Sequence, residues 1–459
     1  MQGRHLIDEP EETLQIREGC LWIEGCSAVE IAACFGTPVH VLSESQLRRN
    51  CRRLLAAFSR HWTCGPVQML PSLKANYVLA LRHILNEEGA GCDVFGLNEL
   101  LTALRAHVAA ASISVNGSAK DAPLIAAAVE AGAQVTLDSE REFELVVAAA
   151  ERLRRRARIR LRIRPDHAAL TEESDFFPGM TIRDAAQLYK PGIEPGAALE
   201  IGRRAIAHPA VELTGLMTHL GRHSADPRVW AKAAGGFGEL VGDLCRAWVP
   251  WRPRELDIGG GFPAPRDPTH PRRAAASDIE VYAEAVGTSL CEALARKGVD
   301  ASGVALQIEP GRSLFADCGV HLSRVRHVKV QARPVPRTWV EVDTTEMFLP
   351  DLLIERAHFR PVFASHAASA PVQSVDVVGI SCGFDLLALE VPAPAVQMGD
   401  VIAFLDTGAY QDAAGSNFNV MGRPGTVLVT GDRARLVKRH ETIDDVLARD
   451  QPSAQDWRS

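Results

Sequence analysis

Short apolar runs alternate with stretches of helical apolar spacing through the middle of the chain, and this alternation predicts strands followed by helices. The predicted strands end at Lys74, Asp93, Asn116, Asp138, Arg164, His219, Gly259 and Glu309. The predicted helices lie at 77–86, 97–106, 122–131, 140–155, 200–207, 229–247 and 279–297. Eight strands with their connections in roughly 250 residues match an α/β fold of the (β/α)8 TIM-like barrel type, and a doubly wound open sheet is the alternative.

A polar residue at nearly every predicted strand end favours the barrel over the open sheet. In a barrel the carboxyl ends of all strands lie on one face, which is where such proteins keep their chemistry. We therefore expect side chains that are far apart in the sequence, such as Lys74, Asp138 and Glu309, to converge.

The pattern changes after about residue 315, where strands separated by turns replace the strand–helix repeat. The predicted strands there are 320–331, 338–342, 375–380, 401–404 and 425–429. Strands near 17–23 and at 39–42 have no partner in the barrel. We expect a barrel at 45–315 and a β-rich domain, of β-barrel or sandwich type, formed by residues 1–44 and 316–459.

The polar stretch 166–190 is long for a connection within a barrel. A mobile lid over a site and an ordinary surface loop both fit its composition. The sequence leaves these two interpretations open.

Composition narrows the possible functions. The chain has 459 residues, of which 46% are hydrophobic and 23% charged, as in ordinary globular proteins. A net charge of −7 argues against a nucleic-acid or anionic-membrane partner, and no apolar run is long enough to span a membrane. The ten cysteines are scattered without a CxxC pair, and the N-terminus lacks the apolar core of a signal peptide. We expect a cytoplasmic protein with reduced thiols and no metal site.

Lys74 follows the apolar run Val67-Gln68-Met69-Leu70. Burying an ammonium group is costly unless it is paired or deprotonated. One interpretation is a lysine that forms a Schiff base with an aldehyde cofactor. The alternative is a surface lysine in a strand-to-helix loop.

Two glycine-containing motifs follow the last two predicted strands, where barrels frequently bind phosphate. They are Gly259-Gly260-Gly261 and Glu309-Pro310-Gly311-Arg312. Together they favour one phosphate cradle with Arg312 as a charge partner, whereas a lone glycine triplet is more often a tight turn. If the cofactor is pyridoxal phosphate, Glu309 belongs at its pyridine nitrogen, and His219 is placed to stack on its ring. An arginine-paired carboxylate and a structural histidine are the alternatives.

The chain resembles the fold-type III pyridoxal-phosphate decarboxylases, which include the diaminopimelate, ornithine and arginine decarboxylases, and it most resembles diaminopimelate decarboxylase-like proteins. The resemblance runs from Leu21 to about Asp450. Its motifs are Leu73-Lys74-Ala75-Asn76, Asp93-Val94-Phe95-Gly96, Leu137-Asp138-Ser139-Glu140, His219-Leu220-Gly221, Gly259-Gly260-Gly261-Phe262, Glu309-Pro310-Gly311-Arg312, Gly408-Ala409-Tyr410 and Ser416-Asn417-Phe418-Asn419.

The resemblance implies pyridoxal 5'-phosphate as cofactor and amino-acid decarboxylation as the activity. Lys74 would form the Schiff base, His219 would stack on the ring, and Glu309 would hold the pyridine nitrogen. Asp93 would support the lysine end of the site. Cys382 would come from the second subunit of a homodimer with shared active sites and would help to return a proton to Cα. The phosphate would be surrounded by Gly259, Gly260, Gly261, Gly311, Arg312 and Tyr410, and the β-rich domain would complete the active site.

The chain departs from the family pattern where substrate is chosen. Gly383 follows Cys382, where the family usually has an acidic residue, and Asp385 stands one position closer to the cysteine. The Arg-Pro-x-Leu-Tyr segment, whose arginine binds a substrate carboxylate in diaminopimelate decarboxylases, is absent. The candidates for substrate contacts are Arg222, His223, Glu346, Arg360 and Asp385.

These departures favour a small-molecule substrate other than diaminopimelate, either another amino acid or an amino acid carried on a larger molecule. Diaminopimelate decarboxylation is the first alternative, and another pyridoxal-phosphate reaction such as racemisation is the second. A catalytically silent homologue is the third, and the intact Lys74, Glu309 and Arg312 argue against it.

Overall fold

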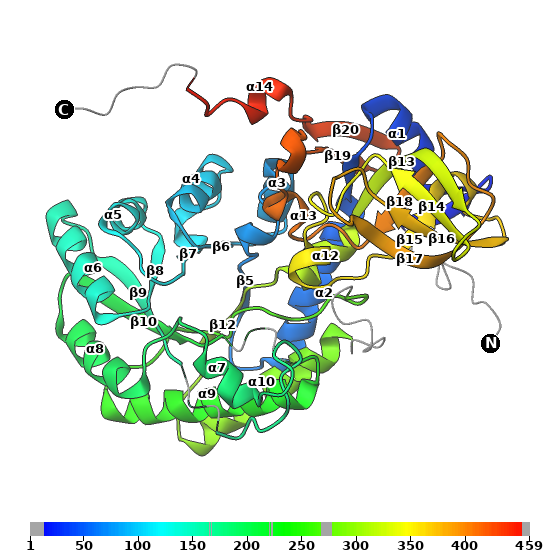
Figure 1. The fold of residues 1–459 in the computed structure, drawn as a ribbon. Helices are drawn as coiled ribbons and strands as arrows, with labels where there is room; N and C mark the ends of the chain where they lie inside the picture. The colour runs from blue at the N-terminus through cyan, green and yellow to red at the C-terminus, as the bar shows by residue number, and fades with distance from the viewer. Residues whose placement is uncertain are drawn as a thin grey trace. The chain divides into compact units, whose positions relative to one another are not determined.

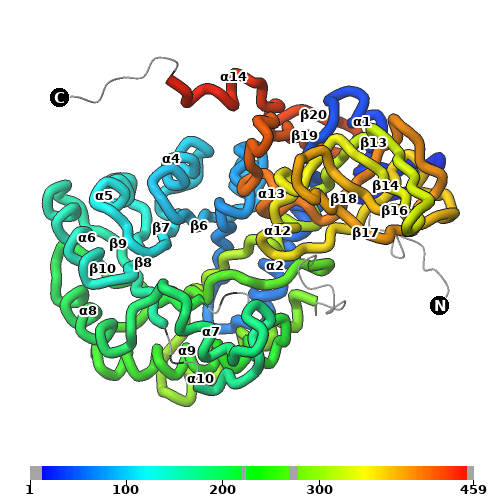
Figure 2. Tube along the Cα trace, viewed as in Figure 1, coloured from blue at the N-terminus to red at the C-terminus, as the bar shows by residue number. Residues whose placement is uncertain are grey.

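The computed structural model describes residues 13–164, 166, 168–219, 221, 224–267 and 278–451. The chain forms two compact units (Figure 1): unit 1 comprises Met1–Leu47, Asp267–Arg272 and Phe315–Ser459, and unit 2 comprises Arg48–Arg266 and Arg273–Leu314. The trace in Figure 2 runs from unit 1 through unit 2 and returns to unit 1. Two of the predicted substrate residues, Arg222 and His223, lie outside the described residues.

Unit 2 contains the expected barrel. Its strands are β5 (Val67–Met69), β6 (Cys92–Val94), β7 (Ile113–Val115), β8 (Gln134–Leu137), β9 (Ala157–Arg162), β10 (Val211–Met217), β11 (Glu255–Asp257) and β12 (Ala305–Ile308). They pair in parallel in the order β5-β12-β11-β10-β9-β8-β7-β6. A parallel bridge joins the two ends of this order, between Ser72, which follows β5, and Asp93, which lies within β6. The prediction of a TIM-like barrel is therefore confirmed.

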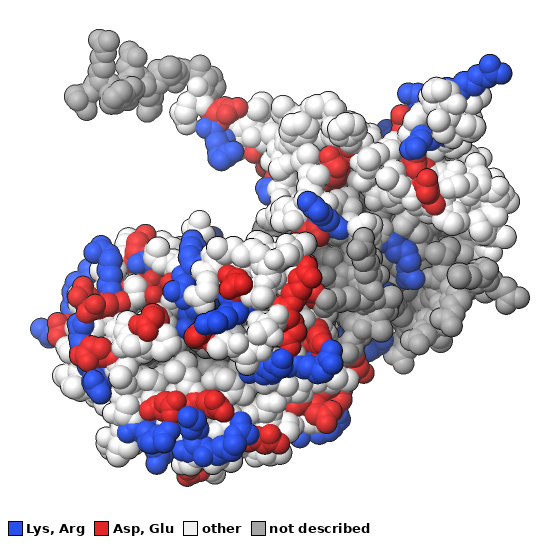
Figure 3. Space-filling view, turned by 60° about the horizontal axis from the view of Figure 1, so that its bottom comes forward, with Lys and Arg blue, Asp and Glu red and all other residues white. Residues whose placement is uncertain are grey.

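Helices cover the outside of the barrel (Figure 1). They are α2 (Glu44–His61), α3 (Leu79–Glu87), α4 (Leu97–Arg105), α5 (Ala122–Ala131), α6 (Glu140–Leu153), α8 (Pro195–Ala207), α9 (Pro227–Ala247) and α10 (Ile279–Arg296). Helix α8 begins before the expected residue 200 because Glu194 caps it and Pro195 suits its first position. On the face shown in Figure 3, Lys and Arg side chains are interspersed with Asp and Glu.

The polar stretch 166–190 has structure of its own. It contains helix α7 (Ile182–Gln187), which Thr181 caps, and a bridge between Glu173 and Thr181. Glu172 forms an ion pair with Lys232 of α9, and Asp175 accepts a hydrogen bond from the backbone N of Ala225 at 2.9 Å. These contacts attach the stretch to the beginning of α9.

Unit 1 is built on two sheets. The first is antiparallel and contains β1 (Leu14–Arg17), β2 (Cys20–Ile23) and β3 (Cys26–Ser27), and helix α1 (Ala28–Phe35) follows it. The second contains β4 (Val39–Ser43), β13 (Gly319–Gln331), β14 (Arg337–Val342), β15 (Pro361–Phe363), β16 (Gln373–Val378), β17 (Leu386–Ala393), β18 (Val401–Leu405), β19 (Gly425–Thr430) and β20 (Arg433–Lys438). Strand β4 lies between β13 and β19, antiparallel to the former and parallel to the latter.

The long strand β13 belongs to two hydrophobic cores. Val320 and Leu322 pack in a core with α1 and the N-terminal strands, whereas Val325 packs in a core with β14 and β16. Strands β3, β15, β17 and β20 were not predicted. Among the described residues, no helix is long and apolar enough to cross a membrane.

Candidate active site

The strand ends of unit 2 bring Lys74 and Asp93 together. Lys74 lies in a 3-10 turn, Leu73–Ala75, shortly after β5. Its Nζ donates a hydrogen bond to Ser72 Oγ at 2.6 Å and lies 3.4 Å from Asp93 Oδ2, to which Ser72 Oγ also donates at 2.6 Å. The Lys74 side chain is 52% exposed whereas Asp93 is buried, so a ligand can reach the amine while the carboxylate stays fixed.

Asn116 connects this pair to Glu309. Its Nδ2 donates to Asp93 Oδ1 at 2.6 Å and to Glu309 Oε1 at 2.5 Å. Burial alone would raise the pKa of Asp93, but the charge of Lys74 and the hydrogen bonds from Ser72 and Asn116 bring it below the usual value. Residues from the ends of four strands thus form one hydrogen-bonded row, as a barrel predicts for strand ends that share a face.

Arg160, on β9, is fully buried and contacts Glu309 and one further carboxyl group, that of Asp257. Its Nη1 lies 2.7 Å from Asp257 Oδ2 and its Nη2 lies 3.9 Å from Glu309 Oε1. Burial, followed by the charges of Asp257 and Asp93, raises the pKa of Glu309 well above its usual value. Burial also raises the pKa of Asp257, although Arg160 opposes this effect.

The charges of this cluster favour a cationic ligand beside Glu309. The positive groups Arg160 and Lys74 face the three buried carboxyl groups of Asp93, Asp257 and Glu309. A protonated ring nitrogen next to Glu309 would add a positive charge and favour the ionised carboxylate. A pyridinium nitrogen therefore fits this end of the site.

His219 follows β10 and is neutral at neutral pH. Its pKa is lowered to about 3, first by burial and then by the charges of Arg162 and Lys74. Its Nδ1 and the hydroxyl of Thr218 are buried and have no hydrogen-bond partner among the described residues. Because buried polar atoms are usually satisfied, these two atoms fit a site that receives a polar ligand.

The glycine triplet lets the chain pass close to His219 and Glu309. A Cβ on Gly259 would lie 2.6 Å from His219 Cδ2, and a Cβ on Gly260 would lie 2.0 Å from the backbone oxygen of Glu309. Gly261 has a φ of +102°, and a Cβ there would lie 2.7 Å from the oxygen of Gly221. The triplet is therefore required by the packing of the strand ends, and its contact with phosphate stays a prediction.

Arg312 and Ser313 follow Gly311 and begin helix α11 (Arg312–Phe315). Arg312 is buried, and so is the hydroxyl of Ser313, which has no hydrogen-bond partner among the described residues. A phosphate group is held by a cation and by hydrogen-bond donors. This turn offers both, and it therefore fits the phosphate end of the cofactor.

In unit 1, Cys382, Glu346 and Asp385 lie in one cluster of loops. Cys382 is exposed. Its backbone N donates to Asn419 Oδ1 at 3.1 Å, and its Sγ accepts a hydrogen bond from Asn419 Nδ2 at 3.4 Å. Glu346 lies beside Gly383, because a Cβ on that glycine would be 3.2 Å from Glu346 Oε1.

Asp385 is buried inside this loop cluster. Its Oδ1 accepts hydrogen bonds from the Thr345 hydroxyl at 3.0 Å and from the backbone N of Glu346 at 2.6 Å. Its Oδ2 accepts from the backbone N of Ser381 at 2.6 Å. Asp385 therefore holds the backbone at Glu346 and Ser381 in place, and its contact with substrate stays a prediction. Tyr410 directly precedes helix α13 (Gln411–Ala414). Arg360 directly precedes β15.

Several site residues carry little signal in the sequence. In β9, Arg160 and Arg162 alternate with Ile159, Leu161 and Ile163. Successive side chains of a strand point to opposite faces, so the two arginines face the barrel interior together. Arg164, which was expected at the site, instead donates from Nη1 to the oxygen of Tyr189 at 3.2 Å.

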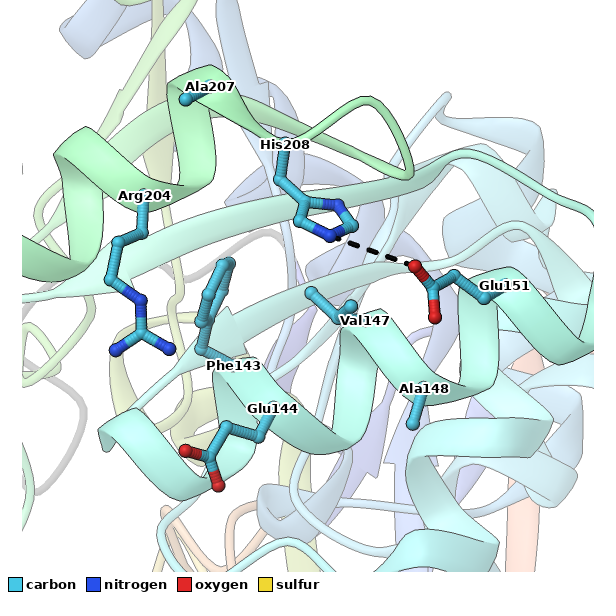
Figure 4. Close-up of a pocket in the computed structure, with 8 residues that line it drawn as sticks. All are labelled: Phe143, Glu144, Val147, Ala148, Glu151, Arg204, Ala207 and His208. Carbon is cyan, nitrogen blue, oxygen red and sulfur yellow. Dashed lines mark ion pairs between the residues drawn. The ribbon is translucent and has the colours of Figure 1, made fainter.

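A cavity of about 440 Å³ lies on the outside of the barrel, between α6 and α8 (Figure 4). It is lined by Phe143, Glu144, Val147, Ala148, Glu151, Arg204, Ala207 and His208. Arg204 lies over the Phe143 ring at 5.1 Å from its centre, and His208 pairs with Glu151 at 3.7 Å. None of the site residues described above lines this cavity, so it is separate from the candidate active site.

Comparison with known proteins agrees with this chemistry. A family model described as "Pyridoxal-dependent decarboxylase, pyridoxal binding domain" matches residues 44–316. The diaminopimelate decarboxylase of Actinosynnema pretiosum subsp. auranticum is 32% identical over 444 residues, covering 95% of this chain and 94% of that protein. The diaminopimelate decarboxylase of Methanocaldococcus jannaschii is 28% identical over 450 residues, covering 96% and 97%. The crystal structure of the M. jannaschii enzyme has a TM-score of 0.86 at 26% identity and covers 96% of this chain and 98% of that chain.

The family match spans the barrel, and the relatives align along nearly the whole chain. Pyridoxal phosphate, the cofactor of this family, agrees with the accessible amine of Lys74 and with a cationic ring nitrogen beside Glu309. The chain therefore belongs to the fold-type III pyridoxal-phosphate-dependent decarboxylases and is an amino-acid carboxy-lyase.

Proposed function

We propose that the enzyme decarboxylates an amino acid whose side chain ends in an ammonium group, with meso-diaminopimelate as the first candidate. The observation that carries this proposal is that relatives aligning with 95% or 96% of the chain are diaminopimelate decarboxylases. These relatives favour diaminopimelate over the different substrate that the altered sequence motifs suggest.

In this proposal the residues around Lys74 prepare the reacting centre. Pyridoxal phosphate, when bound, accepts electron density from Cα of the substrate as carbon dioxide leaves. Lys74 would hold the cofactor aldehyde through its amine, which Asp93 and Ser72 orient. Glu309, held by Asn116 and close to Arg160, would keep the ring nitrogen protonated. The neutral imidazole of His219 would face the ring without adding charge.

Cys382 returns the proton to Cα in this proposal. Its thiol is exposed, and the side chain of Asn419 contacts both its backbone and its Sγ. These two hydrogen bonds fix the direction in which the thiol points. The residues proposed to surround the cofactor phosphate are Gly259, Gly260, Gly261, Gly311, Arg312 and Tyr410.

A homodimer with shared active sites is also part of the proposal. Phe384 is 91% exposed, and Ile380, Phe418 and Val420 are also exposed. The hydrogen bonds between Cys382 and Asn419 link the two segments that carry these side chains. An exposed apolar group of this kind supports an interaction surface around the thiol.

Mixing two inactive variants tests the shared site. Lys74→Ala and Cys382→Ala remove residues that, in a shared site, come from different subunits. Equal mixing with subunit exchange should then restore about one quarter of the wild-type activity, because half of the dimers would contain one intact site of two. Activity that stays at the level of the single variants would show that each subunit builds its own site.

Carbon dioxide release tests the reaction itself. The cofactor-loaded enzyme is offered meso-diaminopimelate, lysine, ornithine, arginine and glutamate in turn. We expect release from diaminopimelate with formation of lysine, and a loss of about 1000-fold or more in Lys74→Ala. Release from another of these amino acids would establish the second candidate, which Gly383 and the missing Arg-Pro-x-Leu-Tyr segment favour. Loss of optical activity of lysine, ornithine, arginine or glutamate without carbon dioxide would indicate racemisation.

A further inference from the structure

Two of the ten cysteines meet beside an outer helix of unit 2. Cys64 lies in the connection between α2 and β5, and Cys291 lies on α10. Their Sγ atoms are 3.4 Å apart, although the two residues are 227 positions apart in the sequence. Both thiols are free and only partly buried. Among the described residues, no other two cysteines form a hydrogen bond with each other.

The end of α2 is held closely against α10. Arg60 forms an ion pair with Glu280, and His61 Nε2 lies 2.7 Å from Glu280 Oε1. A Cβ on Gly287 would lie 2.7 Å from the backbone oxygen of His61, so the two segments touch there. Glu280, Gly287 and Cys291 follow one another at helical spacing and share a face of α10. Cys291 therefore lies on the face that packs against the end of α2.

The backbone around Cys64 is fixed as well. Its carbonyl oxygen accepts a hydrogen bond from the backbone N of Gly303 at 2.7 Å. A Cβ on the next residue, Gly65, would lie 2.3 Å from the backbone oxygen of Val304, and Trp62 Nε1 donates to that same oxygen at 2.9 Å. The two backbones therefore keep the thiols together, and small rotations of the side chains bring the sulfurs to bonding distance, about 2.05 Å.

We propose that Cys64 and Cys291 are a modification site, a dithiol that reacts with a hydroperoxide and closes to a reversible disulfide. This inference goes beyond the decarboxylase activity and does not depend on it.

The two thiols have different roles in this reaction. Burial, followed by the hydrogen bond with Cys291, raises the pKa of Cys64 to about 12. The thiolate is the reactive form of a cysteine, so the first attack on hydrogen peroxide falls to Cys291. Its sulfur bonds to one peroxide oxygen, the O–O bond breaks, and the other oxygen leaves as water with the thiol proton. Cys64 then displaces the remaining oxygen of the sulfenic acid as a second water, and the S–S bond forms. The two electrons that the thiols lose are taken up by the peroxide.

The disulfide would close most of the barrel into a covalent loop. Seven of the eight strands, β5 to β11, lie between the two cysteines. A cross-link stabilises mainly by restricting the unfolded chain, and longer loops gain more. Cys64 precedes β5 whereas Lys74 follows it, so the bond forms at the end of the barrel opposite the reacting amine. We therefore expect oxidation to stabilise unit 2 without reshaping the candidate active site.

Peptide mapping after oxidation tests the site. The full-length, cofactor-loaded protein is treated with hydrogen peroxide, the remaining thiols are blocked, and a non-reducing digest is analysed by mass spectrometry. We expect a cross-linked pair of peptides that contain Cys64 and Cys291. The Tm should rise by about 4–10 °C and return to its first value with dithiothreitol.

Three variants provide the controls. Cys64→Ser and Cys291→Ser should each abolish the cross-link and the rise in Tm, and in the reduced state each should melt within about 2 °C of the wild type. Cys34→Ser removes an exposed thiol on α1 and should keep both effects. A dimedone label should mark the sulfenic acid of Cys291 in Cys64→Ser, whereas Cys64 should stay unlabelled in Cys291→Ser.

Three results would overturn the inference. If peroxide oxidises the exposed Cys34 but leaves Cys64 and Cys291 as free thiols, the pair only fills space. A rise in Tm that persists in Cys64→Ser would come from other cysteines. A cross-link that leaves the Tm unchanged would remove the stabilising role. None of these measurements uses decarboxylation, so a failure here is distinct from a failure of the proposed function.

Discussion

Glu309 is buried with two other carboxylates, Asp93 and Asp257, and with the guanidinium of Arg160. Burial and these like charges raise its pKa well above the usual value. In the cofactor-free protein these neighbours therefore favour its protonated form, whereas a pyridinium nitrogen would favour its ionised form. The charge of this one side chain depends on what is bound beside it.

Glu309→Gln should therefore affect the cofactor-free protein and the cofactor-bound protein differently. Glutamine resembles a protonated glutamate, so the free energy of unfolding of the cofactor-free protein at pH 7 should change by less than about 1 kcal/mol. Carbon dioxide release should nevertheless fall by about 100-fold or more, because an amide cannot hold the ring nitrogen protonated. Urea unfolding without cofactor and a carbon dioxide assay with cofactor measure the two effects.

The pH dependence of the same variant provides the control. A carboxyl group with a raised folded pKa keeps its proton when the unfolded chain has lost it, so its contribution to stability falls as the pH rises from about 4.5. Glu309→Gln should remove this part of the slope. An unchanged slope, with a stability loss above about 3 kcal/mol, would show that Glu309 is ionised in the cofactor-free protein.

The residues at strand ends could be predicted from the sequence, and those within strands could not. Lys74, Asp93 and Glu309 follow apolar runs, and a barrel brings all such positions to one face. Arg160 lies inside a buried strand, where no motif marks it. The approach of Glu346 to Gly383 joins segments far apart in the sequence, and no local pattern contains that information.

Gly260 shows how closely the ends of β11 and β12 approach. A Cβ on Gly260 would lie 2.0 Å from the backbone oxygen of Glu309, so Gly260→Ala must push the two segments apart. We expect a stability loss of about 1–3 kcal/mol in urea unfolding and weaker retention of pyridoxal phosphate.

Gly235 on α9 is the matched control, since nothing lies within 4 Å of a Cβ placed there. Gly235→Ala should raise stability by up to about 1 kcal/mol, because alanine favours the helix. Equal effects of the two substitutions would contradict the close approach at Gly260.

Strands β4 and β13 hold a pair of buried histidines that should make unit 1 sensitive to acid. His40 and His321 are cross-strand partners with their Nδ1 atoms 3.1 Å apart, and His321 Nε2 lies 2.7 Å from Thr344 Oγ1. Burial lowers the pKa of His40 to about 4 and that of His321 well below the usual value. Both rings are therefore neutral in the folded protein.

The unfolded chain binds these protons near pH 6.5, so stability must fall as the pH drops from 6.5 towards 4. His40 alone should contribute a loss of about 3 kcal/mol over this range. Urea unfolding at several pH values measures it. His40→Gln combined with His321→Gln should flatten the profile, whereas replacing the exposed His358 by glutamine should leave it unchanged.

Helices with clear end signals were predicted accurately. The range 122–131 agrees with α5, because Asp121 caps its start and Gly132 ends it in the left-handed conformation. Strands β17 and β20 were missed because most of their residues are only partly buried or exposed, so no apolar alternation marks them. Strand β15 is only three residues long.

The chain as a whole is interleaved, since unit 1 is formed from both ends of the sequence. Its strand β4 lies between β13 and β19, which are synthesised far later. The first strand of the large sheet therefore has no partner until β13 is made and no second partner until β19 is made, and its apolar residues must be protected or collapsed until then.

Substitutions on β4 should therefore destabilise unit 1 much more than substitutions at the far end of β13. Val41 is buried at 1% exposure and Val330 is 73% exposed. Val41→Asp places a charge between two central strands and should destabilise unit 1 by about 3 kcal/mol or more. Val330→Asp should stay within about 0.5 kcal/mol of the wild type. Urea unfolding and soluble yield measure the difference, and similar losses in both variants would argue against a central β4.

The bridge between Ser72 and Asp93 closes the barrel at the point where Lys74 is attached. The hydrogen bonds of Asn116 to Asp93 and Glu309 cross the same junction. Ser72 and Asp93, which orient the reacting amine, are thus also the residues whose backbones close the barrel. The bridge is a backbone contact, in which the N–H of Asp93 donates to the oxygen of Pro71 at 3.1 Å, whereas the amine is oriented by side chains. A descendant that lost the reaction could therefore change the side chains of Asp93 and Asn116 and still keep its closing bridge, so their persistence in a lineage would record the chemistry and not the need to fold.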